Sequence, residues 1–334
     1  MKKKFVLTLA LVLMVAVGLS AATPLTVSGT FTTGYAFKFA DPNVYTQNED
    51  GNEAEVATVV DFTGDFWKVS LDSTAVLYQT DAEVAATAEL YLDKALATEG
   101  IDMGDIALTL HVGNGVSGGA PTVLADLNDF RGSALEMATT GDNFGITLGY
   151  SDLVTVYVSA DPTLTALPMV IGATVNPIDG VSAAVGFSND YTAAGNNGLV
   201  VSAKADVAKL AGLDFALAAT GEMIYDLDAS DTVITADAST TIEGIGLWVA
   251  YFKDAADVNA FAVEASYETV IDKFTVGASL KAQIDDLSDI AGTDEYTIVA
   301  NAKYAMGGAT YNVEAKYEVA AVAFTLTPSV SISF

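Results

Sequence analysis

The sequence predicts an all-β protein, a transmembrane antiparallel up-and-down β-barrel of about 16 strands, within a range of roughly 14 to 18. Apolar and polar residues alternate through most of the chain, and successive side chains of a strand point to opposite faces. The chain is 51% hydrophobic and only 17% charged. After residue 22, however, no apolar run reaches the roughly 20 residues of a membrane-spanning helix. A chain that crosses a bilayer as strands combines these features, because half of each strand faces lipid.

The N-terminus has the pattern of an export signal. Lys2, Lys3 and Lys4 precede an apolar run at 5–19, and Ser20-Ala21-Ala22 follows it. This order is typical of a secretory signal peptide, so we expect residues 1–22 to be removed. A retained membrane anchor is the alternative, but about 15 apolar residues are too few for a spanning helix. Residues 23–334 show no linker and no shift in composition, which favours a single barrel domain.

Charge and cysteine content narrow the classes of partner. The chain has 43 acidic and 14 basic residues, and three of those bases leave with the predicted signal. This balance excludes nucleic acid, which requires a basic footprint, and it attracts cations. The chain has no cysteine, so stability must come from strand pairing or closure rather than from disulfides. Thiolate metal sites are excluded for the same reason.

The first part of the mature chain alternates strands with polar connections. The polar segment 41–53 is predicted to be a loop, and Thr63-Gly64-Asp65 a short hairpin connection. Residues 113–130 break the pattern with a glycine-rich half and a half that could form one or two helical turns. The candidate strands here are 25–39, a strand that ends at the 63–65 connection, and the runs near 66–80, 83–93 and 104–112.

Regular hairpins follow from Ser133 onward. Tight turns are predicted at Ser151-Asp152, at 176–180 and at 210–212, and the acidic, Thr/Ser-rich stretch 226–240 is predicted to be a loop, with or without a short strand. The candidate strands are 132–139, 143–150, 153–160, 169–176, 180–187, 198–207 and 213–225.

The last hundred residues carry the strongest alternation. Near 261–268, for example, Phe261, Val263 and Tyr267 alternate with Glu264 and Glu268. The runs 274–284, 296–304 and 311–319 repeat this register, and four consecutive strands of this kind rarely arise by chance.

A soluble β-sandwich would show the same alternation, but three features favour the barrel. No segment of helical period interrupts the mature chain, and the polar faces are rich in Ser, Thr, Gly and Asn, as in an enclosed lumen. Tyrosines also lie at strand ends: Tyr304 and Tyr311 flank the 306–309 turn, and Tyr150 and Tyr157 flank Ser151-Asp152. Aromatic rings at that height are typical of membrane interfaces, and closure removes edges that lipid would not tolerate.

The final strand, 322–334, is apolar at its even positions, apart from Pro328, and small or hydroxylic at its odd positions; it stops on Phe334. A terminal strand of this kind resembles the closing strand of bacterial outer-membrane β-barrels of the general porin type. The resemblance covers the mature chain in pattern, and only the signal peptide and Phe334 match specific features. It implies an outer-membrane location, Phe334 as the signal read by the barrel-assembly machinery, and a homotrimer in outer-membrane lipid.

A barrel of about 16 strands is wide enough for an aqueous channel. The resemblance therefore implies passive diffusion of ions and small hydrophilic solutes. Charges on the polar faces would then line the lumen and set its selectivity. The alternative is that they pair across strands and only solvate the wall. These predicted lumen charges are Lys38, Glu264, Glu268, Lys281, Lys303, Glu314, Lys316 and Glu318.

The position of segment 113–130, after the fifth candidate strand, resembles the third extracellular loop of general porins, which folds inward. By that resemblance Asp126 and Asp129 supply constriction carboxylates, and Arg131 stands on the following strand. Porins commonly oppose such acids with several arginines, whereas Arg131 is the only arginine here. We therefore expect a cation preference. An ordinary surface loop is the alternative for this segment.

Other functional classes have weaker support. The acidic clusters at 226–231 and 285–295 could bind calcium or bridge lipid head groups through divalent ions, or they could be solvated loops. His111 is the only histidine, and no motif joins it to a nucleophile, so we expect no catalytic residue, no cofactor and no histidine metal site. A surface-exposed structural or adhesin-type barrel without an open channel is the second hypothesis, with binding through loops 41–52 or 226–240.

Overall fold

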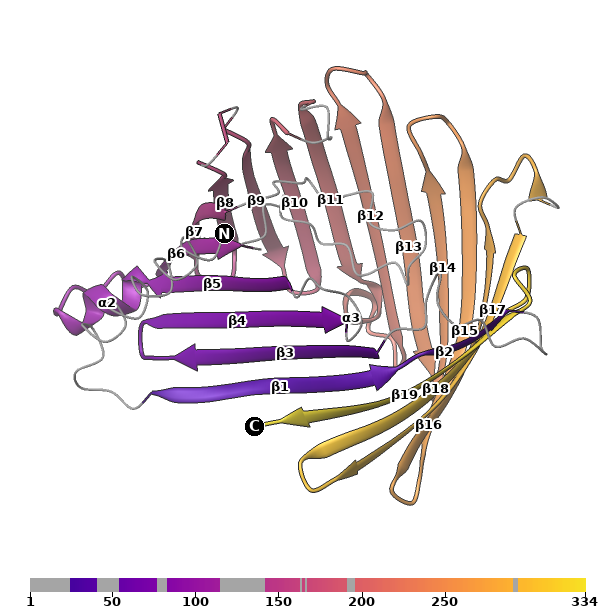
Figure 1. Cartoon of the computed structure of the whole chain (residues 1–334). Coiled ribbons are helices and arrows are strands. Elements are labelled where there is room, and N and C mark those ends of the chain that lie inside the picture. The colour runs from indigo at the N-terminus through magenta and orange to yellow at the C-terminus, as the bar shows by residue number, and fades with distance from the viewer. Residues whose placement is uncertain are drawn as a thin grey trace.

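The computed structural model describes residues 25–40, 54–76, 83–114, 142–162, 164–165, 167–190, 196–290 and 294–334. The predicted signal peptide and the segment 115–141 lie outside these residues. The described part is a single antiparallel sheet of 19 strand segments, with the short helices α2 (Leu92–Thr98) and α3 (Val207–Ala211) (Figure 1).

The strands follow one another along the sheet in sequence order. They are β1 (Thr26–Tyr35), β2 (Phe37–Ala40), β3 (Ala54–Thr63), β4 (Trp67–Val76), β5 (Glu83–Tyr91), β6 (Ile106–Asn114), β7 (Asp142–Tyr150), β8 (Val154–Ala160), β9 (Met169–Ile178), β10 (Val181–Ser188), β11 (Gly198–Asp206), β12 (Ala216–Asp226), β13 (Thr232–Ile242), β14 (Ile245–Lys253), β15 (Asn259–Ile271), β16 (Phe274–Ile284), β17 (Asp294–Met306), β18 (Ala309–Glu318) and β19 (Ala323–Ser333).

Segments β1 and β2 are one barrel strand interrupted at Ala36. Gly34 of β1 lies opposite Ser329, and Phe37 of β2 lies opposite Leu326, so the register against β19 is the same on both sides of the break. The barrel therefore has 18 strands, an even number at the upper end of the predicted range.

The sheet closes on itself through its first and last strands. β1 pairs with β3 on one side and with β19 on the other. The Thr32 hydroxyl donates to the Ser331 hydroxyl at 3.1 Å, and Gly29 and Phe334 exchange two backbone hydrogen bonds of 2.9 and 3.1 Å. Closure leaves no unpaired edge along this seam, and the predicted class, an antiparallel closed barrel, is confirmed.

Connections at one end of the described barrel are mostly two or three residues long, and those at the other end are longer; the exceptions are β5–β6 and β11–β12, which carry α2 and α3. We call one end of the barrel the turn end; it holds the short connections, the start of β1 at Thr26 and the end of β19 at Ser333. The opposite end is the loop end. The β17–β18 turn consists of Gly307 and Gly308, both with positive φ (61° and 83°), a conformation that glycine adopts without strain in a two-residue hairpin.

Three sequence predictions about elements need correction. Residues 232–242 form a full 11-residue strand, β13, where a loop with at most a short strand was expected. Its backbone is paired along both neighbours, β12 and β14. Helical segments do interrupt the chain, since α2 and α3 replace simple turns at the turn end. Gly113 and Asn114 belong to β6 rather than to the following loop.

The two faces of the barrel wall differ in exposure and identify inside and outside. On β14, Leu247 and Val249 are 44% and 40% exposed, whereas their neighbours Trp248 and Ala250 are 7% and 2% exposed. In a closed barrel the exposed set faces outward. Among the strand side chains that the structure describes, the outward face carries charge only at Lys253 and Asp294, at the loop end. Such an apolar belt is the surface that a bilayer requires.

Aromatic residues border this belt at both ends. Tyr150 and Tyr311 are exposed near the turn end, Phe274 packs there against Tyr304 with ring centroids 5.0 Å apart, and Tyr296 and Phe324 lie near the loop end. Tyr157, in contrast, points inward and packs against buried residues of the inner wall. Its predicted place in an interfacial girdle is wrong, because it pairs with Thr147, which shares the inward face.

Candidate functional site on the inner wall

The inner wall collects nearly all the charge that the described strands carry. The inward face holds twelve carboxylates and six lysines among the strand side chains that the structure describes. The carboxylates are Asp61, Asp72, Glu89, Asp206, Glu222, Asp226, Asp237, Glu264, Glu268, Glu295, Glu314 and Glu318; the lysines are Lys38, Lys68, Lys204, Lys281, Lys303 and Lys316. All eight predicted lumen charges are in this set, so they share one face of the sheet.

Some of the predicted lumen charges also lie beside opposite charges. Glu264 of β15 lies directly across from Lys281 of β16, and the Lys316 ammonium is 3.0 Å from the Glu318 carboxylate. Partly exposed pairs of this kind contribute little to stability. Their net effect on the lumen is to leave the unbalanced carboxylates as the dominant charge.

The only histidine belongs to a polar network on β3–β7. His111 Nε2 is 2.9 Å from the Thr147 hydroxyl, and its Nδ1 is 3.7 Å from the Glu89 carboxylate. The Tyr91 hydroxyl donates to the other Glu89 oxygen at 2.7 Å. On the neighbouring strands, Lys68 pairs with Asp61 at 3.0 Å. No sequence motif marks this network, because its members come from five different strands or strand ends.

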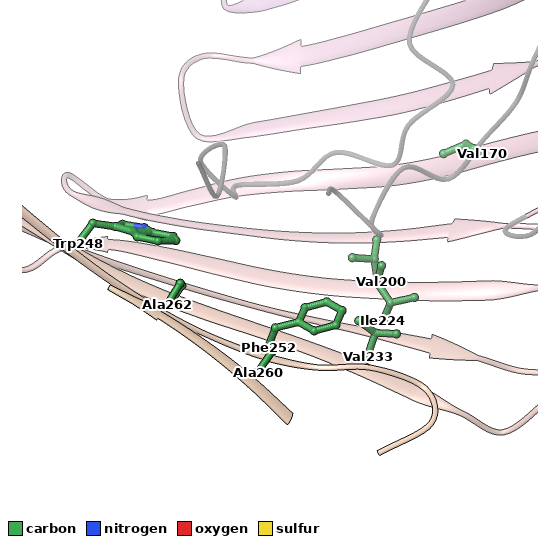
Figure 2. Packing of buried hydrophobic residues seen from close by; sticks show 9 residues of the cluster. Val170, Val200, Ile224, Val233, Trp248, Phe252, Ala260 and Ala262 are labelled. Carbon is green, nitrogen blue, oxygen red and sulfur yellow. The ribbon is translucent and has the colours of Figure 1, made fainter. Parts of the chain in front are cut away.

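A second part of the inner wall, on β9–β15, is apolar and buried; we call it the apolar arc. Its members are Val170, Val200, Ile224, Val233, Trp248, Ala250, Phe252, Ala260 and Ala262, none more than 7% exposed (Figure 2). Val200, Ile224 and Val233 lie side by side in one row across three strands. The lumen is therefore divided into this arc and a polar, partly exposed remainder. The sequence analysis predicted an aqueous channel and did not predict this buried apolar part of the wall.

Polar groups are interspersed in the apolar arc. Ser159, Ser202, Glu222 and Thr235 are all at most 4% exposed. Among them, the Thr235 hydroxyl has no hydrogen-bond partner within the described structure, and the same holds for the Oδ1 atom of Asp237. Buried polar atoms are nearly always paired, so each of these atoms calls for an explanation.

At the loop end, aspartate side chains stabilise the connecting loops by accepting hydrogen bonds; they do not form an acidic cluster open to ions. Asp226 accepts hydrogen bonds from the amides of Asp228 and Ala229, and Asp228 accepts two from Asn197 of the neighbouring loop. Within residues 25–334 as described, no group of three or more acidic or histidine side chains could hold a metal ion.

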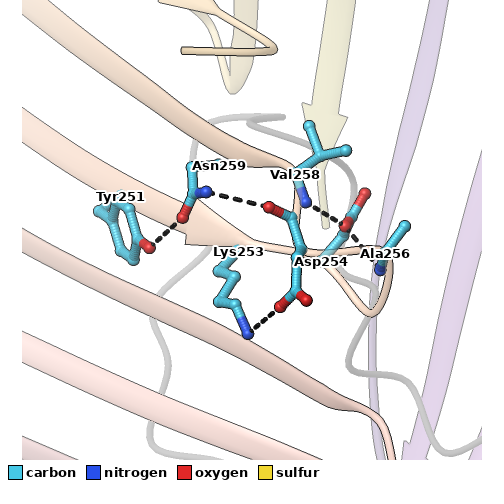
Figure 3. Close-up of polar contacts among 7 residues, drawn as sticks. Tyr251, Lys253, Asp254, Ala256, Val258 and Asn259 are labelled. Carbon is cyan, nitrogen blue, oxygen red and sulfur yellow. Dashed lines mark hydrogen bonds and ion pairs between the residues drawn. The ribbon is translucent and has the colours of Figure 1, made fainter. Parts of the chain in front are cut away.

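In the β14–β15 loop, an aspartate side chain stabilises the backbone in the same way (Figure 3). One Asp254 oxygen accepts from the amides of Ala256 and Val258 at 2.8 and 2.9 Å. Lys253 pairs with Asp257 at 2.6 Å. Aspartate side chains mimic backbone turns in this way, and they hold the loop in one conformation.

The predicted constriction residues Asp126, Asp129 and Arg131 lie outside the described residues. Phe334 lies within them: besides the backbone bonds, its ring rests on Gly29, where an added Cβ would come within 2.8 Å of the ring and 2.3 Å of the Val59 carbonyl oxygen.

The Gly29 position yields a first prediction. Gly29→Ala should lower the stability of the folded barrel by about 1–3 kcal/mol, because overpacking at this seam forces strands apart. The measurement is urea unfolding of the detergent-folded barrel, followed by its heat-dependent gel migration. Gly149→Ala is the matched control, since a Cβ there meets only ordinary contacts from 3.5 Å. Equal stability of the two variants would contradict the prediction.

Comparisons with known proteins rest on fold alone. No family model and no curated protein sequence matches the chain. Among solved structures, it is similar to Pseudomonas aeruginosa OccK2 (OpdF), determined in complex with glucuronate, with a TM-score of 0.57, 10% identity, and 95% and 99% of the two chains covered. The fold is that of outer-membrane porins. Two further solved structures are similar in fold to this porin-type barrel.

Escherichia coli Wzi, described as a carbohydrate-binding outer-membrane barrel involved in group 1 capsule assembly, has a TM-score of 0.56 and 10% identity over 92% of this chain and 84% of its own. A mutant of the Rh. blastica porin has a TM-score of 0.53 and 11% identity over 93% and 100%. The predicted resemblance to outer-membrane β-barrels is confirmed at the level of fold. None of the described helices is long and apolar enough to span a membrane.

Proposed function

We propose that this porin-type barrel is a channel for passive diffusion of ions and small hydrophilic solutes, with a preference for cations. The proposal rests on one observation: nearly all charged side chains of the described strands face the inside of the barrel, and most of them are carboxylates. A water-filled lumen would hydrate these charges, which the lipid-facing side could not do. An 18-stranded barrel also has the width for an aqueous passage.

The polar part of the wall, on β16–β19 and β1–β6, is the side along which ions would pass. Its side chains are partly exposed, and they include Glu314 on one side and Asp72 on the other. Carboxylates at the wall of a narrow, water-filled space raise the local concentration of cations and lower that of anions. Solutes would be filtered by size and by this negative field, without a chemical step.

The solute in the OccK2 structure, glucuronate, is a carboxylate. The wall described here has the same sign of charge as such a solute and would oppose it. We therefore propose cationic or neutral hydrophilic solutes for this chain.

Several predictions from the sequence complete the proposal. Asp126, Asp129 and Arg131 would narrow the passage, Phe334 would direct the chain to the barrel-assembly machinery, and the barrel would reside in outer-membrane lipid as a homotrimer. No catalytic step is proposed.

The test is the reversal potential of single-channel current in a planar bilayer under a KCl gradient, using detergent-folded protein. We expect stable current steps with a potential of the sign that potassium sets. The double variant Glu264→Gln/Glu314→Gln should shift this potential toward zero, whereas Glu243→Gln, in an exposed turn outside the lumen, should not. Anion-selective steps would contradict the charge argument but not the channel.

The apolar arc supports the second hypothesis, a structural or adhesin-type barrel without an open channel. Buried side chains on β9–β15 reduce the space that water can occupy in the lumen. A folded barrel that gives no current steps under any voltage would favour this hypothesis over the channel.

A further inference from the structure

We infer that the β8–β9 loop, residues 161–168, is a membrane contact whose exposed leucines lie among the acyl chains of the surrounding lipid. The inference goes beyond the proposed channel and does not depend on conduction. It rests on the low barrel wall at β8, the apolar surface of the loop, the pairing of its backbone and the conformation of one leucine. Residues 163 and 166 lie outside the described part of the chain and carry none of the argument.

The barrel wall is low at β8–β10. β8 has 7 residues and β10 has 8, whereas β15 and β17 have 13 each, and short turns join all of them at the turn end (Figure 1). At a rise of about 3.3 Å per residue and a tilt of about 40°, seven residues cover about 18 Å of the membrane normal. The apolar band of an outer-membrane barrel is about 25 Å tall, so β8 alone leaves its upper part uncovered.

The pairing of β8 with β9 continues into the loop. Ala160 lies opposite Met169 on the outward face, and the Asp161 amide donates to the Pro168 carbonyl oxygen at 3.0 Å. Both Asp161 and Pro168 are buried. The alternation of faces therefore places the next position, Leu167, on the outward side with Met169.

Leu167 also stands at the level that β8 fails to reach. It is eleven positions from Ile178, the turn-end residue of β9. Phe261, an outward aromatic residue near the loop end of β15, is ten positions from Ile271 at the turn end. Strands of one barrel share a common tilt, so such positions measure height. Leu167 is therefore level with the upper aromatic border of the apolar belt.

The loop exposes leucine and no charge. Leu164 and Leu167 are 45% and 50% exposed, and the only charged residue of 161–168, Asp161, is fully buried. Other connections at the loop end expose acids instead, such as Asp228 between β12 and β13 and Asp257 between β14 and β15. Transfer of leucine side chains from water to hydrocarbon is favourable, and this loop presents no exposed charge that would oppose it.

Much of the loop backbone meets the requirement of a lipid environment. Pro162 and Pro168 have no N–H group to satisfy. The Leu167 amide donates to the Leu164 carbonyl oxygen at 3.1 Å, and the Leu167 carbonyl oxygen accepts from the Asn189 side-chain amide at 3.3 Å. Unpaired backbone groups are not tolerated in hydrocarbon, so these bonds and the two prolines suit the loop to lipid.

Leu167 has a backbone conformation that leucine rarely adopts. Its φ is 46°, a left-handed value at which glycine or asparagine is less strained. If water surrounded the loop, replacing Leu167 by asparagine would relieve this strain. If the side chain contacts lipid, its apolar burial offsets the strain and asparagine forfeits that burial. The same replacement therefore has opposite consequences in the two environments.

The first test is the urea midpoint of the vesicle-inserted barrel that carries Leu167→Asn. We expect a lower midpoint than that of the unchanged chain. The matched control is Ser230→Asn, because Ser230 is an exposed loop residue that also has a positive φ, of 63°. We expect this control to keep or raise the midpoint. An unchanged or raised midpoint for Leu167→Asn would overturn the inference.

The second test locates the residue directly. The chain has no cysteine, so Leu167→Cys can be labelled with the fluorophore NBD at a single position and folded into dioleoylphosphatidylcholine vesicles. Ala265→Cys is the lipid-facing standard, and Ala256→Cys, in the exposed β14–β15 loop, is the aqueous standard. We expect iodide in the buffer to quench the label at 167 at least threefold less than the label at 256. Doxyl-labelled lipid should quench it at least threefold more.

The outcomes separate lipid from other occupants. Equal quenching by iodide at 167 and 256 would overturn the inference. Protection from iodide without quenching by doxyl lipid, or protection that grows with the ratio of protein to lipid, would assign the leucines to a contact between copies of the chain and would also overturn it. Neither test measures current, so a barrel that does not conduct would count against the proposed channel and leave the loop contact standing.

Discussion

The substitution Ala265→Arg is expected to destabilise the membrane-inserted barrel by about 2–4 kcal/mol, whereas Ser266→Arg should leave it folded. Ala265 is the middle residue of β15 and faces outward, level with Leu247. An arginine there would face hydrocarbon at the depth where charge is most costly. Ser266 is its chain neighbour on the inward face and lies between Glu264 and Glu268, so an arginine at 266 would meet water and two carboxylates.

The measurement for this pair is the fraction of protein that folds into vesicles and resists heat-dependent unfolding on a gel, followed by urea titration. The two variants introduce the same side chain at adjacent positions. A difference in their folding therefore cannot come from a difference in composition or translation. Loss of folding in both variants, or in Ser266→Arg alone, would contradict the assignment of the two faces.

The substitution Ile224→Ala is expected to lower barrel stability by about 2–5 kcal/mol. Ile224 faces inward and is fully buried in the apolar arc. Truncation of its side chain removes contacts and leaves a cavity that the neighbouring strands cannot close. If this part of the lumen were water-filled instead, removing an apolar side chain from the wall would cost little.

The matched control is Met223→Ala on the preceding position of β12. Met223 faces outward and is 42% exposed, so lipid can fill the space that its truncation leaves. We expect a much smaller loss of stability than for Ile224→Ala. Urea midpoints and slopes of both variants, measured in the same detergent, decide between a packed arc and a wet wall. Equal losses would contradict the packed arc.

Sequence alternation was sufficient to predict the fold class and the strands with one apolar face. The four strands from Phe261 onward are present as expected, because lipid on one side and a polar lumen on the other impose a strict period of two. The length of strand β13 was underestimated, since the sequence indicated at most a short strand in this region. Its outward residues include Ala236, Ala238 and Thr240, which are too small or polar to mark a face.

The apolar arc was not predicted, because the sequence analysis considered only an aqueous channel lined by polar faces. Met223, Ile224 and Tyr225 form a consecutive apolar run in β12, and such a run indicates a strand buried on both faces. This signal was available in the sequence. The proximity of Asp237 to Trp248 was not, since it depends on the register between β13 and β14 rather than on any local motif.

The same limit applies to the polar network around His111. The residue was visible as a single histidine, but Glu89 and Thr147 become its neighbours only through the pairing of β5, β6 and β7. Residues on one strand can be assigned to a face from their spacing. Contacts between strands need the register, which hairpin turns fix and the amino-acid pattern alone leaves open.

The seam between β1 and β19 also bears on the order of folding. Thr32 and Ser331, which are hydrogen-bonded there, are 299 positions apart in the chain, whereas the other strands pair with sequence neighbours. Local hairpins can form while the chain is incomplete, but this contact must wait until the last strand has been delivered. Pairing over such a separation is slow, because the entropy of the intervening chain opposes it. Until then β1 and the growing hairpins expose open strand edges, the stage at which the chain would be most prone to aggregate.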